Sequence, residues 1–474
     1  MFPQAYLLEM NNVPIYLIEP EKMSKKKTAA IVLAAGMGTR MKSEKPKVMH
    51  HIAGRPMINH LLGTLDTIKC EQTVVVVGPD MEGVELAVAP NLTAVQKDRL
   101  GTADAVKAGL DALGNFKGNI LILYGDTPLI TEQTLNAMLE ARNDNSNPAV
   151  VVLGFEPMDP GEYGRLVTDD EDGELIKIVE AREAKPEELA ISLCNSGVMA
   201  VDGTLLGGLL SRVNNKNAKG EYYLTDIVGL ARDDGFSAAV VEGEEDELVG
   251  INSRYELAQV ETILQDRLRE RAMKAGVTLV DPATVYFSFD TQIDADTVVE
   301  PNVWFGPNVT VGRGSHIKAF SHIEGTFIGN GVSVGPFARL RPGANIGDGA
   351  RVGNFVEIKN ADIEQGAKVN HLSYVGDARV GPGANIGAGT ITCNYDGFMK
   401  SHTDIGEGAF IGSNSALVAP VKIGDGAVVG AGSTITDDVP SDALALARAQ
   451  QKNFDGAAAK LREKKRALKE KKKG

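Results

Sequence analysis

Cysteine is scarce in this sequence. Its 474 residues include three cysteines, Cys70, Cys194 and Cys393. Three thiols at this spacing form neither a disulfide framework nor a zinc site, which excludes disulfide-rich secreted domains and zinc modules. We therefore expect a cytoplasmic protein that works in a reducing compartment.

Long apolar runs and an excess of positive charge are missing as well. No apolar run approaches the roughly 20 residues that a helix needs to cross a bilayer. The formal net charge is −14 at pH 7, and an acidic chain is a poor match for the phosphate backbone of nucleic acid. A chain of this length allows two or three domains. We expect neither a membrane nor nucleic acid as a partner.

The two ends of the chain differ from the rest. Residues 1–27 lack the basic start, long apolar core and small-residue cleavage site of a signal peptide. We interpret them as a non-essential N-terminal extension with Met23 as the natural start. The basic tail after Ala458, LREKKRALKEKKKG, is interpreted as a solvated helix, with a flap over an anionic ligand as the alternative.

Residues 28–254 alternate short apolar runs with helical patterns. Apolar runs without polar alternation are typical of strands that are buried on both faces of a mainly parallel sheet. The runs are Ala30–Ala35, Val74–Val77, Ile120–Tyr124 and Val150–Leu153, and the helical patterns include Ala103–Leu113 and Thr131–Arg142. This alternation predicts a doubly wound, Rossmann-like α/β domain. Residues 255–275 contain neither glycine nor proline and carry apolar residues at helical spacing, which predicts a linker helix.

From residue 276 onward, aliphatic residues recur every six positions, and glycine follows many of them. The two unbroken series are Ile328, Val334, Leu340, Ile346, Val352 and Ile358, and Ile405, Ile411, Leu417, Ile423, Val429 and Ile435. Each hexad of such a repeat forms one face of a three-sided coil, with the aliphatic side chain inside and the small residue at the corner. The pattern resembles the left-handed parallel β-helix of hexapeptide-repeat acyltransferases and predicts that fold for residues 276–474. Residues 393–402 interrupt the repeat and predict an extruded loop.

A glycine loop follows the first predicted strand. Residues 33–47 read LAAGMGTRMKSEKPK, so backbone N–H groups and two cations, Arg40 and Lys47, follow a buried strand, where phosphates can dock. The loop is neither a P-loop nor a dinucleotide-binding fingerprint, because the Gly-Lys-Ser/Thr ending and the third glycine are missing. Its spacing resembles the signature of sugar-nucleotide pyrophosphorylases. An ordinary strand-to-helix turn is the alternative.

Two further side chains are candidates for a metal site. Asp126 follows the buried strand Ile120–Tyr124, at the carboxyl end of a parallel sheet, where such folds bind ligands. Asn252 is a candidate second ligand for Mg²⁺. The alternatives are a helix-capping aspartate and a turn asparagine.

The hexad region contains a candidate general base. Acyl transfer to an amine requires a base that removes a proton from the attacking nitrogen, and histidine suits this task near neutral pH. His371 lies inside the repeat at an outward-facing position. A surface histidine without a catalytic role is the alternative.

The motifs of both halves occur in the order of one family. In the first half they are LAAGMGTRM with Pro46-Lys47, Gln96 before Leu100-Gly101-Thr102, Tyr124-Gly125-Asp126, Tyr163-Gly164-Arg165, Glu180, Asn195-Ser196-Gly197, the segment 220–226 and Asn252. In the second half they are the segments 339–343, 354–359, 371–374, 385–390 and 392–397. With these motifs the chain resembles the bacterial bifunctional UDP-N-acetylglucosamine pyrophosphorylase/glucosamine-1-phosphate N-acetyltransferase family.

The resemblance implies roles in the first half. Arg40 and Lys47 neutralise the triphosphate, and Asp126 and Asn252 bind Mg²⁺. Gln96 and nearby backbone amides read the uracil. The implied set for UTP and UDP-N-acetylglucosamine is Leu33, Ala34, Ala35, Gly36, Lys47, Gln96, Gly101, Thr102, Tyr124, Gly125, Asp126, Gly164, Glu180, Asn195 and Asn252.

It also implies roles in the second half. His371 is the general base of acetyl transfer from acetyl-CoA. The implied ligands of glucosamine-1-phosphate are Arg341, Lys359, Tyr374 and Asn385. The implied ligands of acetyl-CoA are Ala388, Asn394, Tyr395, Ser413, Ala431 and Arg448. In this family that groove lies between subunits, which implies a homotrimer.

The implied activity supplies precursors of peptidoglycan and lipopolysaccharide: N-acetylation of glucosamine-1-phosphate, then uridyl transfer from UTP with release of pyrophosphate. One alternative is a nucleotidyltransferase of the glucose-1-phosphate type with a shorter hexad tail. Another is a non-catalytic regulatory subunit, which has no need of the set Lys47, Asp126, Lys359 and His371.

Overall fold

The computed structural model describes residues 26–169, 171 and 173–472, so most of the predicted extension 1–27 lies outside the described residues. The chain divides into two compact units. Of the described residues, those in 26–50 and 57–256 form one unit, and those in 51–56 and 257–472 form the other. The domain boundaries inferred from the sequence, 28–254, 255–275 and 276–474, stay a prediction.

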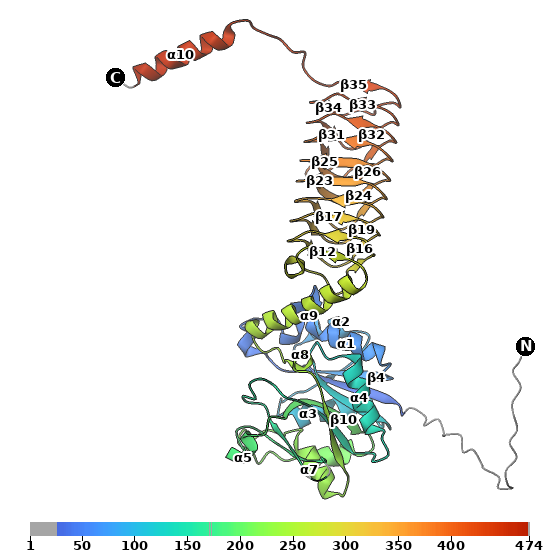
Figure 1. The fold of residues 1–474 in the computed structure, drawn as a ribbon, viewed down its shortest axis with the longest axis vertical. Helices are drawn as coiled ribbons and strands as arrows, with labels where there is room; N and C mark the ends of the chain where they lie inside the picture. The colour runs from blue at the N-terminus through green and yellow to red at the C-terminus, as the bar shows by residue number, and fades with distance from the viewer. Residues whose placement is uncertain (1–25, 170, 172, 473–474) are drawn as a thin grey trace, which may run out of the picture. The chain divides into compact units, whose positions relative to one another are not determined.

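A nine-stranded sheet forms the centre of the first unit (Figure 1). Its main path runs β11 (Ala238–Glu242), β7 (Val150–Phe155), β10 (Cys194–Asp202), β6 (Asn119–Tyr124), β1 (Thr28–Leu33), β4 (Gln72–Val77) and β5 (Leu92–Val95). Strands β8 (Arg165–Thr168) and β9 (Leu175–Val179) are attached beside β10. The four predicted strands are all present. Strand β10 runs antiparallel to both β6 and β7, which the sequence did not reveal.

Helices enclose this sheet. They are α1 (Met57–Thr67), α2 (Glu82–Val88), α3 (Thr102–Leu113), α4 (Glu132–Arg142), α5 (Pro186–Leu189), α6 (Leu206–Leu210), α7 (Asp226–Asp233) and α8 (Glu245–Leu248), with the short helices η1 (Thr39–Met41) and η2 (Lys47–Met49). Ile120 and Ile122 of β6 pack in one core with residues of α3, whereas Leu121 and Leu123, which point to the opposite face, are also fully buried. Burial on both faces explains why the strand sequences lack polar alternation.

The ends of β1 and β6 meet at one edge of the sheet. Leu33 and Tyr124, the last residues of the two strands, are register partners. The N–H of Gly125 donates to the carbonyl oxygen of Leu33 at 2.9 Å. The glycine loop after β1 and the loop that carries Asp126 are therefore neighbours.

Helix α9 (Arg254–Lys274) lies almost entirely in the second unit, and its presence confirms the predicted linker helix. A hairpin of β2 (His51–Ile52) and β3 (Arg55–Pro56) belongs to this unit although the first unit surrounds it in sequence. The N–H of Ala53 donates to Glu261 Oε2 of α9 at 2.8 Å, and the Ala53 carbonyl accepts from the N–H of Phe289 at 2.8 Å. This hairpin was not predicted from the sequence.

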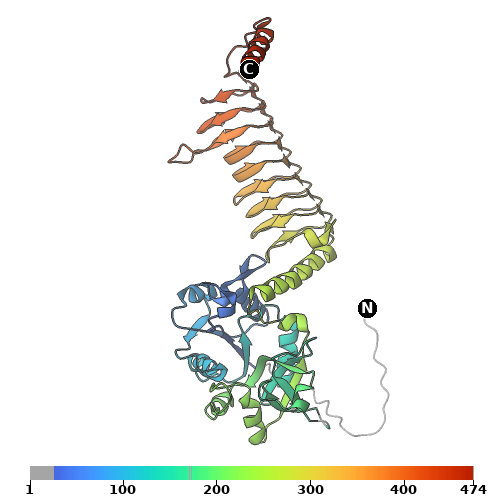
Figure 2. The same cartoon turned by 90° about the vertical axis from the view of Figure 1, so that its left-hand side faces the viewer.

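Short parallel strands stack in three columns to form a β-helix (Figures 1 and 2). The first column is β12 (Thr278–Leu279), β14 (Val298–Val299), β17 (His316–Ile317), β20 (Ser333–Val334), β23 (Arg351–Asn354), β25 (Lys368–His371), β27 (Asn385–Ile386), β30 (Phe410–Ile411), β33 (Val428–Val429) and β35 (Leu444–Ala445). The second is β13 (Gln292–Ile293), β16 (Val309–Val311), β19 (Thr326–Ile328), β22 (Ala344–Ile346), β24 (Glu357–Ile363), β26 (Tyr374–Val380), β29 (Thr403–Ile405) and β32 (Val421–Ile423). The third is β15 (Trp304–Phe305), β18 (His322–Ile323), β21 (Arg339–Leu340), β28 (Ile391–Cys393), β31 (Ala416–Val418) and β34 (Thr434–Ile435), joined through β24 and β26, which turn from one face to the next. The short helix η3 (Pro282–Thr284) lies near the start.

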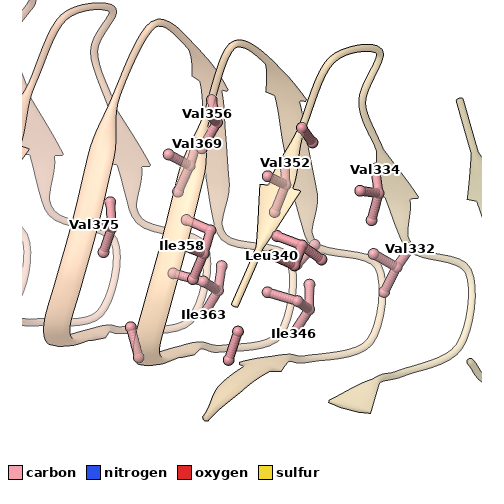
Figure 3. Packing of buried hydrophobic residues seen from close by; sticks show 14 of the residues in the cluster. Val332, Val334, Leu340, Ile346, Val352, Val356, Ile358, Ile363, Val369 and Val375 are labelled. Carbon is pink, nitrogen blue, oxygen red and sulfur yellow. The ribbon is translucent and has the colours of Figure 1, made fainter. Parts of the chain in front are cut away.

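The hexad residues fill the interior of the coils, as Figure 3 shows for part of the stack. All twelve members of the two series are at most 5% exposed. Ile346 pairs with Ile328 in the previous coil and with Ile363 in the next. The inward-facing aliphatic repeat is confirmed.

Glycine at the corners has a steric cause. A Cβ on Gly353 would lie 1.8 Å from the carbonyl oxygen of Asn370 in the next coil, and one on Gly347 would lie 2.8 Å from the N–H nitrogen of Gln365. The backbones of successive coils therefore approach too closely at these corners for a side chain.

The predicted interruption is confirmed. Val380 pairs with Ile405, so the coil between them holds eight more residues than the coil from Ile363 to Val380. The extra chain forms a loop whose tip exposes 92% of Phe398 and 69% of Met399. Figure 2 shows this loop projecting from the stack.

The basic tail contains helix α10 (Ala457–Lys471), and every residue of this helix is exposed. This agrees with a solvated helix. Among the described residues, the helices are all too short or too polar to span a membrane.

Candidate active sites

A cavity of about 270 Å³ opens in the first unit at the carboxyl ends of β1 and β6. Its lining includes ten predicted substrate residues: Leu33, Ala34, Ala35, Gly36, Lys47, Gln96, Gly101, Thr102, Tyr124 and Asp126. The lining also includes Val48, Arg99, Ala105 and Glu221, which were not predicted as site residues. Of these four residues, Arg99 was the easiest to predict, because it is a cation directly before the Leu100-Gly101-Thr102 motif.

The glycine loop has two kinds of glycine. Gly36 has open space where a Cβ would stand, so its backbone faces the cavity. Gly38 has a φ of +62°, and a Cβ there would lie 2.6 Å from Lys47 Cβ. Gly38 therefore allows both the left-handed turn and the close approach of Lys47. Arg40 is exposed in η1 and is not part of the cavity lining.

Asp126 and Asn252 converge on one cation. Lys47 Nζ forms an ion pair with Asp126 Oδ2 and donates to Asn252 Oδ1 at 3.0 Å. The N–H of Ile251 donates to the Asp126 carbonyl at 2.9 Å, and the N–H of Asn252 donates to Glu256 Oε2 at 2.7 Å, so both loops are fixed. A carboxylate oxygen and an amide oxygen are ligand types that suit Mg²⁺, which proteins commonly bind through one or two side chains plus substrate phosphates.

The predicted sugar residues lie close to one another and to Tyr124. The N–H of Asn195 donates to the Gly164 carbonyl at 2.8 Å. Burial raises the pKa of Tyr124, and the nearby charges of Asp126 and Glu180 raise it further. Burial also raises the pKa of Glu180, although a hydrogen bond from Thr225 opposes the shift. Gly125 follows Tyr124 and is buried.

In the second unit, His371 is the last residue of β25, and its side chain is exposed. Its Nδ1 lies 2.6 Å from Asn354 Oδ1, on the register partner in the previous coil. With the amide oxygen as acceptor, Nδ1 carries the proton, and Nε2 keeps a lone pair that can accept one. Asn354 was not predicted as a site residue. An alignment of the repeats of adjacent coils would have placed it beside His371.

The predicted sugar-phosphate ligands follow on the next face. Arg341 Nη1 pairs with Glu357 Oε1 at 2.8 Å, and Glu357 is the register partner of Tyr374. Lys359 Nζ lies 3.3 Å from Asp377 Oδ2. Asn385 is the register partner of Lys368 in the coil of His371. Arg341, Lys359 and Tyr374 are thus brought together from three successive coils.

Four of the predicted acetyl-CoA residues, Ala388, Ser413, Ala431 and Arg448, follow one another along successive coils. The N–H of Asn414 donates to the Ala388 carbonyl and that of Gly432 to the Ser413 carbonyl, both at 2.8 Å. Arg448 Nη1 continues this series by donating to the Ala431 carbonyl at 2.7 Å. Asn394 is buried at the base of the inserted loop, where its Nδ2 donates to Asp377, whereas Tyr395 in the loop is exposed and its hydroxyl donates to the Gly397 carbonyl.

Comparison with known proteins covers both units. The model of the MobA-like NTP transferase domain matches residues 30–167. The model of the bacterial transferase hexapeptide, with six repeats, matches residues 325–360 and 402–437. A bifunctional protein GlmU from Paramagnetospirillum magneticum is 61% identical over 450 residues, which are 95% of this chain and 100% of that protein. The chain belongs to the GlmU family of bifunctional proteins.

Other GlmU proteins give the same result. The one from Rhodospirillum rubrum is 61% identical over 92% of this chain and 97% of its own length. The one from Zymomonas mobilis is 52% identical over 92% of this chain and 98% of its own length. The GlmU match also spans residues 361–401, between the two hexapeptide matches, where His371 and the inserted loop lie.

Membership of the GlmU family gives the chain its class. It is an enzyme, a transferase that combines a nucleotidyltransferase domain with a hexapeptide-repeat acyltransferase domain. The second unit is accordingly the left-handed parallel β-helix that the hexads predicted.

Proposed function

We propose that the chain makes UDP-N-acetylglucosamine in two steps. The second unit transfers acetyl from acetyl-CoA to glucosamine-1-phosphate, and the first unit then transfers uridyl from UTP to the product. The proposal rests chiefly on the gathering of two different sets of reactive side chains, one around Lys47 and one around His371, in a chain of the GlmU family.

The uridyl step needs no protein nucleophile. A phosphate oxygen of N-acetylglucosamine-1-phosphate attacks the α-phosphorus of UTP, the new P–O bond forms, and the bond to the β-phosphate breaks to release pyrophosphate. Asp126 and Asn252 would hold Mg²⁺, which supplies charge neutralisation on the phosphates. Lys47 would then turn from these oxygens to the triphosphate, with Arg40 as the outer cation. Gly36 leaves room for the phosphates beside backbone N–H groups.

The acetyl step needs one base. The sugar amine attacks the thioester carbonyl, the new N–C bond forms, and the C–S bond breaks. His371 Nε2 accepts the proton that the amine loses and can return it to the departing thiolate. Asn354 supports this role because it binds Nδ1 and directs Nε2 outward. Arg341 and Lys359 would neutralise the sugar phosphate, with Tyr374 and Asn385 beside the amino sugar.

The second unit is also the proposed site of assembly. A hexapeptide β-helix is suited to oligomerisation, and we propose a homotrimer. Ser413, Ala431 and Arg448 are exposed on successive coils of one copy, which leaves space for a neighbouring subunit to complete the acetyl-CoA groove. A cytoplasmic location and a role in supplying peptidoglycan and lipopolysaccharide synthesis belong to the same proposal.

One assay with two variants tests the proposed function. Glucosamine-1-phosphate, acetyl-CoA, UTP and Mg²⁺ should together yield UDP-N-acetylglucosamine, and omission of any one should abolish it. His371→Ala should lower acetyl transfer by at least about a hundredfold, because it removes the base, and should leave uridyl transfer nearly intact. Asp126→Ala should do the reverse.

His322→Ala, which changes an exposed histidine of β18, is the matched control and should keep both activities. Equal loss of both activities in either test variant would contradict two independent sites. Failure of the wild-type protein to form either product would favour the regulatory-subunit alternative.

A further inference from the structure

Gln96 is held by two acceptors on its amide nitrogen. Its Nε2 donates to the Gly101 carbonyl and to Asp104 Oδ2, each at 2.9 Å. Asp104 is the third residue of α3, where the helix dipole favours a carboxylate, and its Oδ2 also accepts from the N–H of Leu100 at 3.4 Å. Gln96 itself is 6% exposed, yet it lines the cavity.

These neighbours fix which end of the amide is which. A carboxylate and a backbone carbonyl only accept hydrogen bonds, so the group between them must be the NH₂ of Gln96. Rotation of the amide by 180° would place Oε1 against two acceptors and lose both hydrogen bonds. Oε1 is therefore the polar atom of this side chain that remains for a ligand in the cavity.

A fixed acceptor discriminates between the pyrimidine bases. N3 of uracil carries a hydrogen and donates, whereas N3 of cytosine carries a lone pair and accepts. An amide that could rotate would present Nε2 to cytosine and Oε1 to uracil. An amide fixed with Oε1 toward the base can pair with N3 of uracil but not with N3 of cytosine. With cytosine, two acceptors would face each other, and both would be desolvated without a hydrogen bond.

We propose that Asp104 is a specificity-determining positioning residue: it locks the Gln96 amide so that the site selects a uridine over a cytidine nucleotide. The inference rests on the proposed uridyl transfer and on Gln96 as the reader of the base. Asp104 acts through Gln96 and needs no contact with the nucleotide.

The test compares UTP with CTP. The full-length protein is assayed with N-acetylglucosamine-1-phosphate and Mg²⁺, and kcat/KM is measured for each nucleotide. Asp104→Ala and Asp104→Leu remove the acceptor and should reduce the UTP-to-CTP ratio about tenfold, which is the order of one hydrogen bond to a charged group, through a higher KM for UTP. Asp104→Asn retains an oxygen that can accept from Nε2 and should keep the ratio within about threefold of the wild-type value.

Controls separate this role from a general effect on the fold. Asp111→Ala changes an exposed aspartate on the same helix and should leave the ratio unchanged. Acetyl transfer by the same samples reports on their integrity. Titration with uridine and cytidine monophosphates gives the ratio without turnover, so a variant with weak catalysis is still informative.

The outcomes are distinct. An unchanged ratio in both acceptor-free variants would overturn the role of Asp104. A ratio that falls as far in Asp104→Asn as in Asp104→Ala would also overturn it, because charge rather than amide orientation would then be responsible. Absence of uridyl transfer in the wild-type protein would instead refute the proposed function.

Discussion

Three side chains share the carboxylate of Asp377. Asn360 Nδ2 donates to its Oδ1 at 2.7 Å, Asn394 Nδ2 donates to its Oδ2, and Lys359 Nζ lies 3.3 Å from Oδ2. Burial alone would raise the pKa of Asp377, but these donors outweigh it, and the net pKa is lowered. Asp377 therefore holds a proposed phosphate ligand and a proposed acetyl-CoA ligand in one network.

Asp377→Asn should weaken both function and stability. We expect kcat/KM for glucosamine-1-phosphate to fall about tenfold, and the free energy of unfolding at pH 7 to fall by about 1–3 kcal/mol, because hydrogen bonds to a charged acceptor are lost. A carboxyl with a lowered folded-state pKa stabilises the fold above its unfolded pKa of about 3.9 and loses this effect as pH falls through the lower folded value.

Denaturant unfolding at several pH values measures this difference. The difference in unfolding free energy between the wild type and Asp377→Asn should have its full value near neutral pH. It should shrink as pH falls below about 4. Asp362→Asn, at an exposed carboxylate that accepts from Asn345, is the matched control and should change little. A difference that is independent of pH would show that the carboxylate charge is not responsible.

Gly38→Ala should displace Lys47. Alanine at a φ of +62° is strained, and its Cβ would collide with Lys47 Cβ. We expect uridyl transfer to fall at least about tenfold, the effect of roughly 1.4 kcal/mol in transition-state binding, with acetyl transfer unchanged. Gly83→Ala in α2, where a Cβ meets no atom within 4 Å, is the control and should keep both activities. Full activity of Gly38→Ala would contradict the positioning of Lys47.

The site residues that could be predicted from the sequence are those that lie in a recognisable local sequence pattern. The glycine loop and Asp126 directly follow buried strands, so the sheet edge brings them together. Asn354 and Asp377 act across adjacent coils, and Asp104 acts on a residue before its own helix. Such partnerships depend on register and side-chain rotamers, which a single sequence does not specify.

At the scale of elements, predictability follows the range of the interaction. The hexad repeat determines a local coil, so its inward positions and its interruption were both visible in the sequence. Strand β10 inserts antiparallel between β6 and β7, and the hairpin β2–β3 joins the other unit. Both arrangements depend on pairing between distant segments, and no local period encodes them.

The coil core should respond in proportion to lost volume. Ile346 is fully buried between Ile328 and Ile363. Ile346→Ala should lower the unfolding free energy of the β-helix by about 2–5 kcal/mol, and Ile346→Val by about 0.5–1.5 kcal/mol. Denaturant unfolding, monitored through the loss of acetyl transfer, measures both stability changes. Equal effects of the two variants would contradict tight packing at this coil.

At the scale of the whole molecule, each proposed site draws its side chains from one unit. His371→Ala and Asp126→Ala proteins, mixed together, should therefore convert glucosamine-1-phosphate to UDP-N-acetylglucosamine, although neither does so alone. The acetylated sugar phosphate released by one protein serves the other. Product formation by coupled assay measures this, and the separate variants are the controls. A mixture that makes no product would mean that both steps require one intact chain.

The hairpin of residues 51–56 gives the chain an interlaced order. The backbone passes from the first unit to the second and back before it crosses again after residue 256. Division of the chain after residue 256 would therefore leave both fragments incomplete. The first fragment would contain the hairpin, but Ala53 would lack its hydrogen-bond partners Glu261 and Phe289. The second fragment would lack the hairpin. The second unit therefore depends on a segment that lies within the first unit's part of the sequence, and a fragment that starts after residue 256 cannot contain the complete second unit.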